Sequence, residues 1–180
     1  MNRQLYVLLL IALLIVLMLF FNKKVCLFQL FKEQFKVYKN DNKDKHSPWD
    51  IICFIVLPIC VSLLIVLGIP YQIDVKLAEI LTTVFSLVFT ILFGFAAVIV
   101  ERSYSDNDKK KRVIGETFVS IVTSTTLSLV AAIISILLTI IDNDIVVSVL
   151  SVALFTLSLH LVMLLLMITK RTFIIYCEVD

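Results

Sequence analysis

Residues 77–100 read LAEILTTVFSLVFTILFGFAAVIV and carry one charged side chain, Glu79. This run is longer than the roughly 20 residues that a helix needs to cross about 30 Å of hydrocarbon. The whole chain has the same character, because 61% of its 180 residues are hydrophobic and 17% are charged. Three glycines and three prolines are too few for the turns of a β-barrel. The sequence therefore predicts an all-α polytopic membrane protein.

Four further apolar runs bring the predicted number of transmembrane helices to five; they cover residues 5–21, 51–69, 117–141 and 145–169. Fourteen of the sixteen basic residues fall in the segments after the first, third and fifth runs. By the positive-inside rule these segments are cytoplasmic, so the N-terminus is outside and the C-terminus is inside. We therefore expect a multi-pass protein of the inner (plasma) membrane. Its three parts are an N-terminal anchor (1–22), a basic amphipathic segment (23–50) and a four-helix bundle with a short cytoplasmic tail (51–180).

The segment at residues 24–39, KVCLFQLFKEQFKVYK, has the spacing of an amphipathic helix. Its aromatic residues recur every three or four positions, while Lys32 and Lys36 fall on another face. Such a helix can lie in the headgroup layer. The alternative is that it continues the first span as one rod, whose aromatic stripe packs against copies of itself or a partner.

A second basic block, Lys109, Lys110, Lys111 and Arg112, precedes the fourth run. It either enforces topology or binds a phosphate-bearing ligand, such as a lipid headgroup, a nucleotide or a nucleic acid, although no nucleic-acid motif is present. The Asp142-Asn143-Asp144 link predicts a tight hairpin with Asp144 as an N-cap. Two carboxylates fall short of a calcium shell. We expect no metal and no cofactor.

Two stripes of small and hydroxyl-bearing residues follow helical periodicity within the apolar runs. The first comprises Glu79, Thr83, Ser86, Thr90 and Gly94, and the second comprises Ser120, Ser124, Ser128 and Ser135. Such stripes either let helices pack closely or line a narrow aqueous path. Two of them in so small a chain favour a homo-oligomer, for which we expect a tetramer.

His160 lies near the middle of the fifth run. An ionisable residue at this depth is a functional candidate, and the alternative is a neutral imidazole bonded to a neighbouring hydroxyl. Pro58 predicts a kink in the second run.

No cluster of acids, histidines or cysteines indicates an enzyme, and no repeated halves indicate a transporter. The layout resembles the small multi-pass membrane proteins of bacterial antiphage defence systems of the Kiwa and Hailong type. The resemblance is carried by the segment FKEQFKVYKNDNKDK (31–45) and by the span hairpin that leads to KKKRVIGETFVSIV (109–122). It implies a homo-oligomeric membrane effector, a channel or pore-forming component gated by a cytoplasmic partner or ligand. The alternative is a non-conducting anchor or envelope sensor that recruits a soluble protein.

Overall fold

The computed structural model describes residues 27–37, 52–69, 71–101, 108–141 and 143–177, and every regular element among them is helical. In chain order these elements are α2 (Leu27–Val37), η1 (Ile52–Val56), α4 (Leu57–Leu63), η2 (Leu64–Gly68), α5 (Val75–Glu101), α6 (Asp108–Ile140) and α7 (Asp144–Cys177), where η denotes a π-helix. The all-α prediction is confirmed for this part of the chain.

Three of these helices, α5, α6 and α7, are long and apolar enough to cross a membrane. They coincide with the third, fourth and fifth predicted runs. α6 begins at Asp108, nine residues before the predicted start of the fourth run, so the Lys109–Arg112 block forms its first turn. Its 33 residues extend about 50 Å, longer than the hydrocarbon core, so a basic end can stand in the headgroup layer.

The second predicted run forms a shorter apolar helix, Ile52–Gly68, that is divided into η1, α4 and η2. Pro58 lies at the first of these boundaries, at the start of α4, where it cannot donate the backbone hydrogen bond of a regular helix. The helix type changes at this proline, and the predicted kink stays a prediction. The first predicted run, residues 5–21, lies outside the described residues, so five spans remain a prediction.

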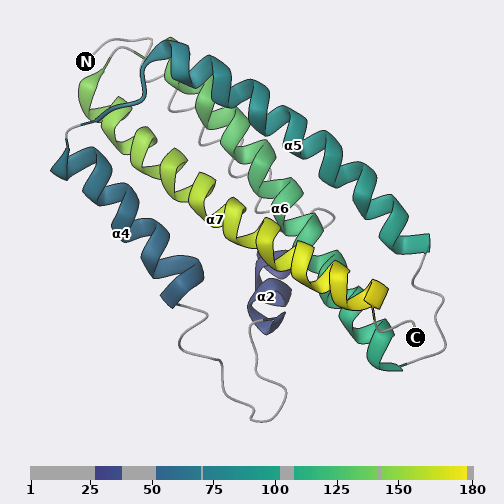
Figure 1. Ribbon diagram of the computed structural model, residues 1–180. Helices are drawn as coiled ribbons and strands as arrows, with labels where there is room; N and C mark the ends of the chain where they lie inside the picture. The colour runs from purple at the N-terminus through teal and green to yellow at the C-terminus, as the bar shows by residue number, and fades with distance from the viewer. Residues whose placement is uncertain (1–26, 38–51, 70, 102–107, 142, 178–180) are drawn as a thin grey trace.

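Figure 1 shows the long helices side by side in the order of the chain, with α6 between α5 and α7 and with α4 against the far side of α7. Among the described elements, α5 contacts α6 and α4 contacts α7, whereas α5 and α4 do not meet. α5 is therefore the outermost helix on one side of this row, and one face of it has no neighbour within the described chain.

The core of the bundle is centred on α6. The serines of its predicted stripe are fully buried, as are Ile121 and Ala131. α5 packs against this small-residue face with a heptad-spaced row of apolar side chains, Ala78, Phe85, Leu92 and Ile99. In lipid there is little hydrophobic driving force between helices, so small side chains stabilise such a contact by allowing close van der Waals packing.

The link between α6 and α7 corrects one detail of the sequence analysis. The side chain that caps α7 is Asn143, whose Oδ1 accepts from the backbone N–H groups of Ile145 and Val146 at 3.1 and 3.3 Å. Asp144 is instead the first helical residue, where its carboxylate interacts favourably with the positive end of the helix dipole. At the start of α5, Asp74 plays the capping role and accepts from Leu77 N–H at 3.0 Å.

The predicted amphipathic segment is helical as α2, which packs against α6. Its most buried described side chain is Gln34, at 3% exposure, while Phe35 and Lys32 are exposed. Phe31 joins the apolar cluster around Leu127 and Leu164. Contact with the bundle thus involves Gln34 together with Phe31, one residue of the predicted aromatic stripe.

Candidate functional site

The two predicted stripes lie in opposite environments. On α6, Ser120, Ser124, Ser128 and Ser135 are fully buried. On α5, Glu79, Thr83, Ser86, Thr90 and Gly94 are all exposed. The structure therefore does not bring the two stripes together: the α6 stripe lies inside the bundle and the α5 stripe faces away from it.

Most hydroxyl groups of both stripes donate to their own helix. Ser120 and Ser135 donate to the carbonyls of Glu116 and Ala131, each at 2.9 Å. Ser124 is the exception, because its buried Oγ has no hydrogen-bond partner among the described residues. Bonding within the helix lets a hydroxyl sit in an apolar contact without requiring a partner on the neighbouring helix.

On α5 this pattern has a different consequence, because the hydroxyls are exposed. Thr83, Ser86 and Thr90 donate to the carbonyls four residues earlier, at 3.2, 2.8 and 2.9 Å. Each proton is thereby occupied, and the oxygen presents its remaining lone pairs outward. A Cβ at Gly94 would meet no atom within 4 Å. The stripe on the outward face of α5 is thus open and offers hydrogen-bond acceptors, between exposed apolar side chains such as Leu87 and Ile91.

A second polar arrangement joins α7 to the antiparallel segment from η1 to the start of α5. Three of its contacts use serine or threonine hydroxyls: Ser62 with Thr156 at 2.6 Å, Gln72 with Ser148 at 2.7 Å, and the Ile73 N–H with Ser151 at 3.2 Å. They hold the interrupted second helix against α7 by hydrogen bonds that cross the interface.

The fourth contact of this row involves His160. Its Nδ1 lies 2.6 Å from the carbonyl oxygen of Phe54. In a regular α-helix that carbonyl would accept from the residue four positions later, which is Pro58 and has no N–H. Pro58 therefore cannot donate to the Phe54 carbonyl, and the imidazole Nδ1–H donates to it. This arrangement realises the hydrogen-bonded alternative for His160, with a backbone carbonyl in place of the expected hydroxyl.

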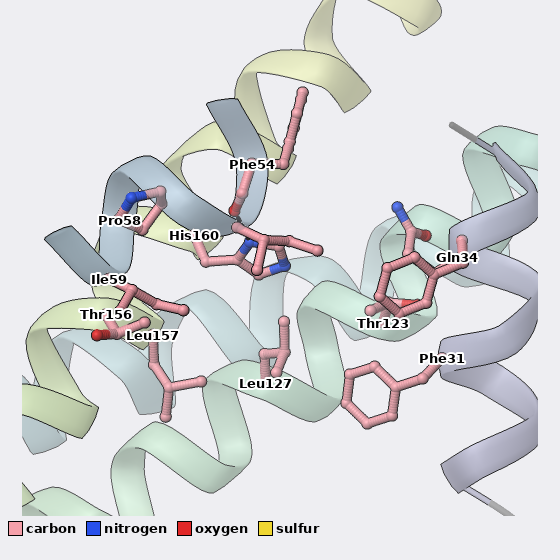
Figure 2. Close-up of a pocket in the computed structure, with 12 residues that line it drawn as sticks. Phe31, Gln34, Phe54, Pro58, Ile59, Thr123, Leu127, Thr156, Leu157 and His160 are labelled. Atoms are coloured by element: carbon pink, nitrogen blue, oxygen red, sulfur yellow. Dashed lines mark hydrogen bonds between the residues drawn. The ribbon is translucent and has the colours of Figure 1, made fainter. Parts of the chain in front are cut away.

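A cavity of about 210 Å³ adjoins His160, between α2, the second helix, α6 and α7. Figure 2 shows Phe31 and Gln34 entering from α2, Thr123 and Leu127 from α6, and Pro58 and Ile59 from the opposite wall. The sequence analysis singled out His160 and Pro58 but did not foresee the cavity. A proline within a helix cannot donate to the carbonyl four residues earlier, here that of Phe54, and this was a signal for the contact with His160.

The predicted basic residues of α6 lie beside the C-terminal part of α7, at one end of the bundle. Glu116 bridges two arginines, with Arg112 Nε at 3.0 Å and Arg171 Nη2 at 3.3 Å. Lys111 and Lys170 are exposed beside this bridge. Lys109 and Lys110 belong to the same first turn of α6, while Lys32 and Lys36 lie on α2.

Within the described residues, no group of three or more His, Cys, Asp or Glu side chains could hold a metal ion. Together these features define an all-helical protein with three helices capable of crossing a membrane. No protein-family model, curated protein or solved structure matches the chain.

Proposed function

We propose that this protein is a homo-oligomeric membrane effector whose conducting path is lined by the outward stripe of α5. The observation that carries the proposal is the exposure of Thr83, Ser86, Thr90 and Gly94 on α5, the long helix at the edge of the described row. Small side chains on a membrane helix allow close approach of another helix, and the carboxylate of Glu79 is unfavourable in lipid, so contact with other copies or with water is the favourable arrangement.

The chemistry of the stripe favours cations. The hydroxyl protons of Thr83, Ser86 and Thr90 are used within the helix, so the oxygens offer acceptors to a passing ion or water. Glu79 is exposed at one end of the same face. Rings of acidic side chains at a pore mouth concentrate cations, and symmetric copies of α5 would form such a ring. The resemblance to antiphage defence components supplies the proposed context, in which a cytoplasmic partner or ligand opens the path.

The test is the Thr90→Val variant, which keeps the shape of the side chain and removes the hydroxyl. A hydrogen bond between membrane helices contributes about 0.6 kcal/mol on average, so assembly survives the change. A more apolar ring at a narrow point favours dewetting and a closed pore. We expect normal assembly by native mass spectrometry and loss of cation flux in liposomes or of single-channel current.

Thr82→Val is the matched control, because Thr82 is half-buried on the flank of α5 that turns toward the bundle. Its hydroxyl also bonds within the helix, to the carbonyl of Ala78 at 2.9 Å, so the chemistry of the substitution is the same. We expect unchanged flux. Equal flux in Thr90→Val and the wild type would remove α5 from the path.

The alternative function is a non-conducting anchor that recruits a soluble partner, and the basic end of the bundle favours it. Lys111 and Lys170 present exposed charge beside the bridge at Glu116. An anchor should retain its activity in Thr90→Val and lose it when these lysines are changed to glutamine. An effector should lose its activity in Thr90→Val.

A further inference from the structure

The cavity beside His160 has the composition of a small-molecule site. Its walls are mainly aliphatic and aromatic side chains, including Phe31, Phe54 and Leu127, with few polar groups among them. Small-molecule sites are typically apolar concavities in which a small number of polar atoms fix the orientation of the ligand. Phe35 lines the cavity and is 43% exposed, so the cavity reaches the surface of the described chain.

The hydrogen bond to Phe54 determines what His160 offers to this cavity. A backbone carbonyl only accepts, so Nδ1 carries the proton in the 2.6 Å contact. In the neutral ring, Nε2 is then an acceptor. Figure 2 shows the two ring nitrogens on opposite sides, one toward the Phe54 carbonyl and the other toward the space beside Thr123 and Leu127. No described side chain donates a hydrogen bond to His160 at Nε2.

The volume sets the size of the occupant. A cavity of about 150 Å³ lined by aliphatic and aromatic side chains is known to hold benzene. The present cavity, at about 210 Å³, has room for a single aromatic ring with a substituent. Phe31 and Phe54 supply faces and edges against which another ring packs favourably.

We propose that this cavity binds a compact phenol, with the aromatic ring among Phe31, Phe54 and Leu127 and with the hydroxyl donating to Nε2 of His160. The proposal is independent of conduction, because the cavity and the α5 stripe belong to different faces of the row of helices. A lipid acyl chain could fill the same apolar volume, but it has no donor for the imidazole. The preference for a donor is therefore what distinguishes the two occupants.

The experiment uses photolabelling of the full-length protein in detergent micelles. 4-Azidophenol is the probe, and peptide mass spectrometry identifies the labelled residues. Phenol and benzene compete for the site, with both concentrations corrected for partitioning into the micelle. We expect saturable labelling in α2, in residues 54–59 and around Leu127. Phenol should compete roughly threefold to tenfold better than benzene, the range that corresponds to one neutral hydrogen bond.

Two variants locate the site. Leu127→Trp fills the cavity and should abolish saturable labelling, whereas Leu166→Trp, at a position of α7 that is 62% exposed, is the matched control and should leave it unchanged. His160→Phe should retain labelling but lose the preference for phenol. Because that change also removes the hydrogen bond to the Phe54 carbonyl, it is repeated with Pro58→Ala, which adds a backbone N–H four residues after Phe54.

Labelling that does not saturate, or that falls mainly on the exposed face of α5, would overturn the proposal. Equal competition by phenol and benzene in the wild-type protein would also overturn it and would assign the cavity to an acyl chain. A phenol preference that persists in the Pro58→Ala/His160→Phe double variant would show that His160 is not the acceptor.

Discussion

At the residue scale, Pro58 and His160 form one functional unit, although 102 positions separate them in the chain. The proline removes a backbone donor, and the imidazole replaces it on the carbonyl of Phe54 at 2.6 Å. Each residue carries a cost inside a membrane: the proline lacks a backbone N–H, and the histidine requires a hydrogen-bond partner. The contact with the Phe54 carbonyl gives the imidazole its hydrogen-bond partner.

This unit predicts a non-additive pair of substitutions. His160→Phe should destabilise the protein by about 0.5–1.5 kcal/mol, the net contribution of one hydrogen bond. Adding Pro58→Ala should recover much of the loss, because residue 58 then donates to Phe54 within the helix. The measurement is reversible unfolding in mixed micelles as the fraction of denaturing detergent rises. A double variant no more stable than His160→Phe would disprove the coupling.

At the element scale, α5 and α6 carry similar stripes with different structural roles. The α6 stripe is fully buried and sets how closely α5 and α7 approach, while the α5 stripe is exposed. The periodicity of each stripe could be predicted from the sequence, since the hydroxyl-bearing residues recur every three or four positions. Which stripe is internal could not, because both patterns have the same spacing and composition. The outcome depends on which helix occupies the middle of the row.

This contrast predicts opposite responses to one substitution. Ser128→Leu places a branched side chain in a fully buried position and should destabilise the fold by about 1–3 kcal/mol. Ser86→Leu makes the same change at an exposed position of α5, so it should alter the stability of the monomer by about 0.5 kcal/mol or less. Unfolding in mixed micelles compares the two. Equal destabilisation would contradict the arrangement of the helices.

At the scale of the whole molecule, the bundle places the basic ends of α6 and α7 together. The Arg171–Glu116 contact at 3.3 Å brings the end of α7 beside the start of α6, so two of the three basic segments predicted to be cytoplasmic share one end. The polar contact of Gln72 with Ser148 lies toward the opposite end. Residue charge alone predicted this grouping, because basic residues gather on one side of a membrane. The cavity beside the second helix could not be predicted from the sequence, since it depends on how α2 and α7 pack against that helix.

The orientation of the bundle follows as a prediction. Reporter fusions after Lys110 and Asp180 should report the cytoplasm, and fusions at Gln72 and Asn143 should report the outside. The test is the activity of paired reporters that function on one side of the membrane each. An external signal at Lys110 would contradict the five-span topology.

The central claim is that copies of this protein meet along the outward stripe of α5, and a disulfide cross-link tests it most directly. Thr90→Cys is introduced after the four native cysteines have been replaced, and membranes are oxidised before non-reducing electrophoresis. A disulfide forms only when the two Cα atoms lie within about 7 Å, so the bond reports direct contact. Val162→Cys, at an exposed position of α7, is the control. We predict covalent dimers for Thr90→Cys and monomers for Val162→Cys; monomers for Thr90→Cys, or dimers for Val162→Cys alone, would contradict the account.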